Sequence, residues 1–296
     1  SAGVKQALFN VLFSLFGPGD SVLIPSPYWT SYPELVQLAK ADPVIVGGDP
    51  ENDYKVGPRQ LEPAADDSTR AVLLNSPCNP TGATYSLEEL RSIAEWAKSR
   101  DLWIISDEIY RRIYFKGSVA PGIFDLPADL TEKAILLDGT SKAFAMTGWR
   151  IGFSYTSPEV AEKLSALQSQ TTSNATTPAQ YAALAAYQAG AEVDEAVETM
   201  RTAFHARRDL MLELFASRLP GVAVLEPDGA FYLWVNGERF ARPGEGSIQF
   251  CERLLDEYGV GVVPGTAFGD DRYFRMSFAY SEDTLRDAVN RLEKAL

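Results

Sequence analysis

Three short apolar runs most constrain the fold of this chain: residues 71–74, 102–105 and 134–137. Each is only a few residues long and apolar throughout, which is typical of strands buried on both faces of a parallel sheet. Residues 86–99 lie between the first two runs and predict a helix, because Ser86 and Glu89 form a capping-box pattern ahead of apolar residues at helical spacing. Alternating strands and helices predict an α/β fold with a mainly parallel sheet.

The second part of the chain has a different pattern of predicted helices and strands. A helix is expected from Ser157, and a long helical region from about 178 to 219 is interrupted near Gly190. Beyond Pro220, short strands and helices mix, which predicts a smaller α+β domain. The expected strands are 222–224, 230–235, 260–263 and 273–278, and the expected helices are 247–258 and 281–296. We therefore expect a large domain over residues 1–195 and a C-terminal small domain over 196–296, which includes the linking helix.

Composition excludes several classes of function. The net charge of −13, from 27 basic and 40 acidic residues, argues against a nucleic-acid or anionic-membrane partner. No apolar run approaches the ~18 residues of a membrane helix. Two cysteines, Cys78 and Cys251, cannot form a disulfide framework, and with no secretory signal visible the cytoplasm is expected. A single histidine, His205, argues against a histidine-rich metal site and a Ser-His-Asp mechanism, so no metal is expected.

Polar residues follow each of the three buried runs, at the carboxyl ends where open α/β sheets bind ligands. The segments are residues 75–82, residues 106–110 and a loop that contains Lys142. Small residues before Lys142 let the backbone pass close to a ligand, and Arg150, eight residues on, offers a fork of donors for a phosphate. The alternative for Lys142 is a solvated lysine in a surface turn.

The segment Gly139-Thr-Ser-Lys142-Ala-Phe-Ala-Met-Thr-Gly-Trp-Arg150-Ile-Gly resembles the lysine signature of class I and II aminotransferases. The resemblance implies the pyridoxal 5'-phosphate (PLP) transferase fold type I, with a large PLP-binding domain and a smaller C-terminal domain. It makes Lys142 the residue that forms a Schiff base with PLP, and Arg150 a phosphate ligand. Many relatives have a phosphate-binding serine where this chain has Gly139, and Ser141 is expected to compensate.

The same resemblance gives roles to the segments after the first two runs. Asp107 is expected to pair with the pyridine nitrogen and keep the ring electron-poor, since a carboxylate in a partly desolvated site favours the protonated ring. Tyr110 and Asn79 are expected to donate to the phenolic oxygen, while Ile109 packs on one ring face. Without the resemblance, Asp107 is equally consistent with a turn or helix-capping aspartate, and Asn79 with an ordinary loop.

Three further parts of the site come mainly from the resemblance. Ala2, Gly3 and Val4 are assigned to the phosphate-binding turn, because free N–H groups at a helix start favour anions. Trp29 is expected to stack on the ring face opposite Ile109, with a core tryptophan as the alternative. Arg275 is expected to bind the substrate α-carboxylate, with a structural ion pair as the alternative.

We therefore expect a cytoplasmic, homodimeric PLP-dependent aminotransferase, most similar to the prokaryotic-type aspartate aminotransferases. Its substrates would be aspartate or a related amino acid and a 2-oxo acid. Lys142, Asp107 and Tyr110 would act in catalysis, and Trp29, Asn79 and Arg275 would contact substrate. Family members carry a long N-terminal segment before the phosphate-binding glycine, with residues that affect substrate choice, and this sequence lacks it. A PLP-dependent lyase or decarboxylase, or a catalytically silent protein of this fold, remains an alternative.

Overall fold

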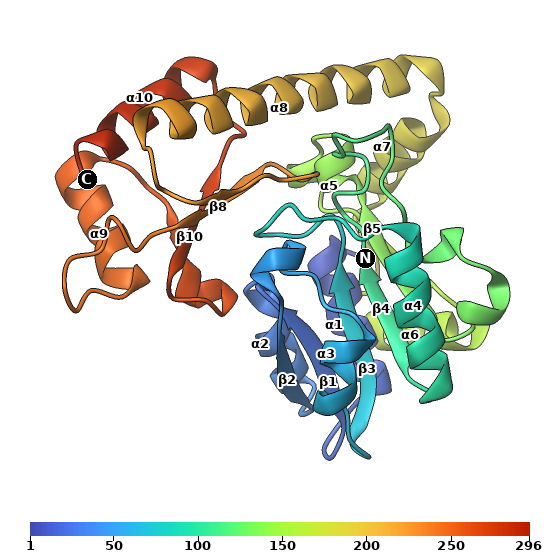
Figure 1. The fold of residues 1–296 in the computed structure, drawn as a ribbon. Coiled ribbons are helices and arrows are strands. Elements are labelled where there is room, and N and C mark those ends of the chain that lie inside the picture. Colours follow the sequence, from blue (N-terminus) through green and yellow to red (C-terminus); the bar gives the residue numbers. More distant parts are fainter.

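The computed structural model describes residues 1–296, and its larger element is a six-stranded sheet in the order β2-β1-β3-β4-β5-β6 (Figure 1). Strands β1 to β5 are parallel, and β6 pairs with β5 in the antiparallel direction. The strands are β1 Ser21–Ser26, β2 Asp42–Gly47, β3 Thr69–Asn75, β4 Trp103–Asp107, β5 Ala134–Gly139 and β6 Gly152–Tyr155. The three predicted runs are thus β3, β4 and β5, adjacent at the centre of the sheet, and the predicted α/β fold is confirmed.

Helices cover both faces of this sheet, because successive strand side chains point to opposite sides. Leu73 packs in the core that contains α1 and α6, whereas Val72 and Leu74 pack in the core that contains α4. The helices of this part are α1 Val4–Leu15, α2 Ser31–Leu38, α3 Pro58–Leu61, α4 Leu87–Ser99, α5 Thr140–Ala143, α6 Pro158–Thr171 and α7 Thr177–Gln188. Burial on both faces explains why each central strand contains a run of consecutive apolar residues.

Helix α4 begins as the sequence predicts. The Ser86 hydroxyl accepts a hydrogen bond from the Glu89 backbone N–H at 3.2 Å, and the Glu89 carboxylate accepts one from the Ser86 N–H at 2.7 Å. This reciprocal cap satisfies two backbone donors that the helix itself leaves free.

The second sheet is four-stranded and antiparallel, in the order β7-β8-β10-β9. Its strands are β7 Val224–Leu225, β8 Tyr232–Asn236, β9 Val263–Pro264 and β10 Tyr273–Ser277, and it is accompanied by α9 Ser247–Tyr258 and α10 Glu282–Glu293. The strand predicted at 222–224 is shifted to Val224–Leu225, and the one predicted at 260–263 is shifted to Val263–Pro264. Gly259 ends α9 in a left-handed conformation, and the pairing of β9 with β10 starts only at Val263.

The long helix α8, Ala191–Arg218, runs from the first sheet to the second and packs against α10 (Figure 1). The predicted boundary between residues 195 and 196 falls in the first turns of α8, and the division into two domains there stays a proposal. None of the helices combines the length and the apolar character needed to cross a bilayer.

Candidate active site

The carboxyl ends of β3, β4 and β5 meet, and so do the polar segments that follow them. Asn75 is in register with Asp107, which is in register with Leu137 on β5. The Asn75 side-chain amide joins two segments: its NH2 donates to the Asp107 carbonyl at 2.9 Å, and its oxygen accepts from the Asn79 N–H at 2.8 Å. Lys142 lies just past β5, in the short helix α5.

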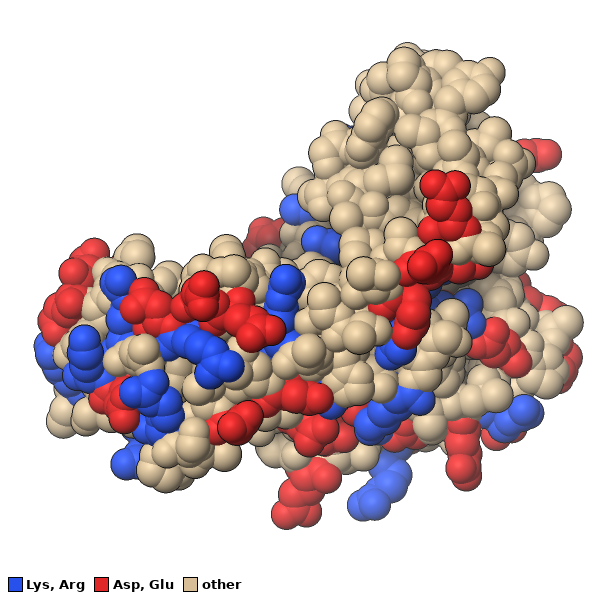
Figure 2. Space-filling view, turned by 90° about the horizontal axis from the view of Figure 1, so that it is seen from above, with Lys and Arg blue, Asp and Glu red and all other residues tan.

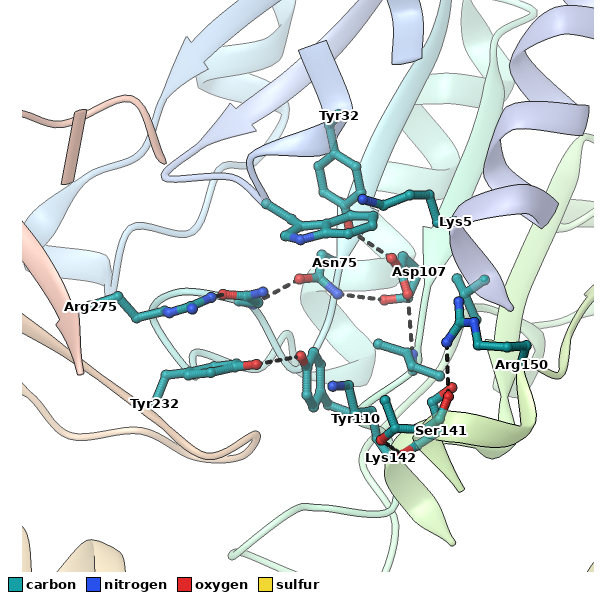
Figure 3. Close-up of a pocket in the computed structure, with 15 residues that line it drawn as sticks. Lys5, Tyr32, Asn75, Asp107, Tyr110, Ser141, Lys142, Arg150, Tyr232 and Arg275 are labelled. Carbon is teal, nitrogen blue, oxygen red and sulfur yellow. Dashed lines mark hydrogen bonds between the residues drawn. The ribbon is translucent and has the colours of Figure 1, made fainter. Parts of the chain in front are cut away.

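A cavity of about 340 Å³ opens at these strand ends (Figure 3). All but two of the residues predicted from the sequence line it; the two that do not are Ala2 and Gly3. The predicted residues that do are Val4, Trp29, Asn79, Asp107, Ile109, Tyr110, Ser141, Lys142, Arg150 and Arg275. Residues far apart in the sequence therefore converge on one hollow, and the cavity includes a residue of the second sheet, Arg275.

Asp107 is a buried carboxylate at the floor of the cavity, with 3% of its surface exposed. Burial raises the pKa of this carboxyl to about 6, although hydrogen bonds from the Tyr32 hydroxyl at 2.8 Å and the Ile109 N–H at 3.3 Å favour its charged form. The hydrogen bond from the Ile109 N–H is the local contact expected of a turn aspartate, the alternative interpretation of Asp107. The other carboxylate oxygen instead accepts from Tyr32, which is distant in the sequence, and this bond fixes the carboxylate within the cavity.

Lys142 is a half-buried amine with no carboxylate partner. Burial lowers the pKa of this amine, and the positive charges of Arg275 and Arg150 lower it further. Its Nζ atom lies 5.7 Å from the Tyr110 ring centre and 5.3 Å from that of Phe231. A lysine in this position is more readily deprotonated, and so more nucleophilic, than a lysine in a surface turn.

Arg150 lies against the turn that precedes α1. One Nη atom donates to the Ala2 carbonyl at 3.3 Å, and the other donates to the Thr147 carbonyl at 3.0 Å. Gly3 precedes α1 with φ +90°, and a Cβ atom there would lie only 2.4 Å from Arg150 Nη2. Ala2 and Gly3 therefore shape the site by seating Arg150 beside the helix start, without lining the cavity. Together the arginine and the free N–H groups of α1 form a site suited to an anion.

Arg275 enters the cavity from β10. Its Nη1 donates to the Asn79 side-chain oxygen at 2.8 Å, and its Nε is buried without a partner. The structural ion pair that sequence reasoning left open is absent, because no Asp or Glu lies within ion-pair distance of Arg275. A guanidinium with an unsatisfied buried donor is poised for an anionic ligand.

Several residues that line the cavity were not predicted: Lys5, Tyr32, Asn75, Thr147 and Tyr232. Asn75 directly ends a buried strand, and that signal could have identified it. Lys5 follows the predicted phosphate-binding turn, and its amine lies 4.9 Å from the Trp29 ring centre. Tyr32 and Tyr232 give no such signal, because their roles depend on contacts with residues distant in the sequence.

The charges around the cavity contrast with those of the whole chain. Lys5, Lys142, Arg150 and Arg275 contribute four cations, and Asp107 is the only carboxylate among the lining residues. None of the four cations forms a salt bridge, although the chain has an excess of acidic residues. The cavity therefore suits a ligand that carries several negative charges.

The sequence of this chain is similar to a known protein family and to named relatives. A family model described as aminotransferase class I and II matches residues 1–292. The chain is 39% identical over 294 residues to the aspartate aminotransferase of Bacillus subtilis, an alignment that covers 99% of this chain and 74% of the relative. It is 39% identical over 298 residues to the probable aspartate/prephenate aminotransferase of Aquifex aeolicus, covering all of this chain and 75% of the relative.

A solved structure gives the same result for the fold. The Thermus thermophilus aspartate aminotransferase with maleate superposes with a TM-score of 0.93 at 39% identity, covering all of this chain and 75% of that one. The region matched by the family model contains every residue that lines the cavity.

Proposed function

The chain belongs to the class I and II aminotransferase family, and from this premise we propose that it is a PLP-dependent enzyme that transfers the amino group of aspartate, or of a closely related amino acid, to a 2-oxo acid. The family predicted from the lysine segment is thus confirmed. The observation that carries the proposal is Lys142, a half-buried amine of lowered pKa in a cavity otherwise rich in anion-binding groups.

The residues present fit PLP. Asp107 offers a buried carboxylate to the pyridine nitrogen, and Tyr110 and the amide NH2 of Asn79 offer donors to the ring oxygen. Arg150 and the start of α1 suit the phosphate. Trp29 and Ile109 supply apolar surface for the two ring faces. When bound, PLP supplies an electron sink for the carbanion that forms at the amino-acid Cα.

The protein's own groups then act on the substrate. The Lys142 amine is placed to bond covalently with a carbonyl carbon and, once released, to take the proton from Cα and return it elsewhere. Arg275 holds the α-carboxylate, so that the Cα–H bond has a fixed direction. Lys5, at the Trp29 side of the cavity, adds a cation for a second carboxylate, which supports an acidic donor such as aspartate.

Two measurements test this proposal. Borohydride reduction of the PLP-loaded protein, followed by peptide mapping, should find the pyridoxyl group on Lys142, and a label on another lysine would contradict the assignment. A screen of common amino acids should then give stoichiometric pyridoxamine phosphate, most rapidly with aspartate. Release of pyruvate and ammonia would instead identify a lyase, and no reaction with any donor would identify a silent protein.

We also propose that the protein forms a homodimer. Residues 164–191 contain no charged side chain, and on α7 the exposed fractions of Tyr181, Leu184 and Tyr187 are 70%, 48% and 43%. Figure 2 shows a protruding part of the surface with few charges beside regions where both signs are mixed. Exposed apolar patches of this kind mark association surfaces. Sedimentation equilibrium at micromolar concentration should give twice the chain mass, and a monomer would contradict the proposal.

The two cysteines support the cytoplasmic location proposed from the sequence. Both Cys78 and Cys251 are free thiols in the structure, as expected in a reducing compartment.

A further inference from the structure

Tyr232 is a buried tyrosine that connects the two sheets within the cavity. It lies on β8, and its hydroxyl is 2.9 Å from the hydroxyl of Tyr110, which follows β4 (Figure 3). Both side chains are less than one-tenth exposed. Neither the family signature nor the local sequence around Tyr232 points to this contact.

The ring of Tyr232 seats Arg275. In the antiparallel pairing of β8 with β10, Tyr232 lies opposite Ser277, so Arg275 is its diagonal neighbour on the same face. The guanidinium carbon is 4.3 Å from the Tyr232 ring centre and 4.9 Å from that of Phe268. With Asn79 holding one Nη atom, these rings fix the guanidinium without any carboxylate partner.

The hydroxyl of Tyr232 has a separate consequence for Tyr110. A phenol has one O–H to donate, so a Tyr110 that donates to a ligand must accept from Tyr232. Burial raises the pKa of the Tyr232 phenol, and the positive charge of Arg275 beside it offsets part of that rise, which favours donation because the charge stabilises the electron density left on the oxygen. Hydrogen bonds in such a chain strengthen one another in a buried site. The other charged groups that face the pair are Lys142, over the Tyr110 ring, and Asp107.

We propose that Tyr232 is a positioning residue with two separable actions: its ring holds Arg275 in the orientation that binds a carboxylate, and its hydroxyl donates to Tyr110, which donates to the ring oxygen of the cofactor. The proposal rests on the proposed function for its second action only. The first action concerns carboxylate binding and can be measured without PLP.

Two substitutions separate the actions. Tyr232→Phe keeps the ring and removes the hydroxyl, whereas Tyr232→Leu removes both. In the PLP-loaded protein, the visible absorption of the cofactor reports its own protonation. We expect Tyr232→Phe to raise the pKa of this chromophore by about 0.3 to 1 unit, a two- to tenfold change in its dissociation constant, because the unprotonated form loses hydrogen-bond support. In a Tyr110→Phe background, Tyr232→Phe should add no further shift.

Maleate, an unreactive dicarboxylate, tests the ring. Calorimetry on the cofactor-free and PLP-loaded proteins should show maleate affinity within about twofold of the parent for Tyr232→Phe, but about three- to tenfold weaker for Tyr232→Leu. The control is Tyr280→Phe, which removes an exposed hydroxyl after β10 and should change neither quantity. Thermal unfolding of each variant shows whether the effects follow stability instead.

Each result decides one of the two actions of Tyr232 or the proposed function. An unchanged chromophore pKa in Tyr232→Phe, or a further shift in the Tyr110→Phe background, overturns the hydroxyl action. Equal maleate affinity in the Phe and Leu variants overturns the ring action. A parent protein that binds no PLP refutes the proposed function, and the maleate comparison on the cofactor-free protein still decides the ring action.

Discussion

Replacement of Asp107 by Asn should stabilise the cofactor-free protein at high pH while it damages catalysis. The folded-state pKa of Asp107 is about 6, above its ordinary value of 3.8, because burial disfavours the charge. Between these two values the folded protein binds more protons than the unfolded chain, so the Asp107 contribution to the free energy of unfolding falls as pH rises. Above pH 6 the full cost of burying the charge is present. A rise of this pKa from 3.8 to about 6 corresponds to about 3 kcal/mol.

An asparagine removes that cost but offers one acceptor where Asp107 has two. Either the Tyr32 hydroxyl or the more distant Ile109 N–H, at 3.3 Å, loses its partner. Loss of the weaker bond costs about 1 kcal/mol. The free energy of unfolding should therefore rise by about 2 kcal/mol at pH 8 and fall by about 0.5 kcal/mol near pH 4, where the folded carboxyl is protonated and the unfolded one is about half ionised.

Urea unfolding of the cofactor-free parent and variant at both pH values measures this difference. Asp256→Asn, on the exposed side of α9, is the control, and it should show no change of sign with pH. A variant that is equally destabilised at pH 8 and pH 4 would refute the reasoning. In the PLP-loaded protein the same substitution should slow Cα deprotonation by orders of magnitude, since an amide cannot hold the pyridinium proton. A near-normal single-turnover rate would remove Asp107 from catalysis.

Two further substitutions test the anion-binding groups. Arg275→Lys keeps the charge but loses the forked geometry. The binding free energy of aspartate or maleate, measured by calorimetry, should therefore weaken by about 1.5 to 3 kcal/mol, with PLP affinity unchanged. A lower melting temperature with unchanged affinity would mean a structural role for Arg275. Gly3→Ala places a methyl group 2.4 Å from Arg150 Nη2 at φ +90°, so the guanidinium must move. A cost of about 1 to 3 kcal/mol should lower PLP affinity, measured by absorbance titration, by about five- to 150-fold. The control Gly17→Ala, in open space, should bind PLP normally, and normal binding by Gly3→Ala would contradict the seating of Arg150.

The central strands were predictable because burial on both faces leaves an apolar run that stands out in the sequence. The edge strands β2 and β6 were not predicted, and neither was β1, which lies between β2 and β3. Strand β2 is largely exposed or half-exposed, and proline interrupts both β1 and β2, at Pro25 and Pro43. Strand β6 is short and lies at the other edge. Strands β2 and β6 lack the continuous apolar pattern that identifies the centre, whereas β1 has only a short apolar run, residues 22–24, before Pro25.

Whether a site residue could be predicted also depends on whether it follows a buried strand. Asp107, Asn79 and Lys142 follow buried strands, and the rule that parallel strand ends converge is enough to bring them together. Tyr32 and Tyr232 act through partners 75 and 122 residues away in the chain. Their local surroundings read as ordinary helix and strand, so only the register of the sheets and the packing between them could show that they reach the cavity.

The unpaired cations of the cavity connect ligand binding with the reactivity of Lys142. Burial lowers the pKa of the Lys142 amine, and the charges of Arg275 and Arg150 lower it further, which favours its unprotonated, nucleophilic form while the cavity holds no anion. A phosphate at Arg150 and a carboxylate at Arg275 would each neutralise part of that charge. The amine should then become more basic at the stage when it must accept the Cα proton. One set of charges can thus serve the two opposite requirements of the lysine, because the ligands themselves change the field in which it titrates.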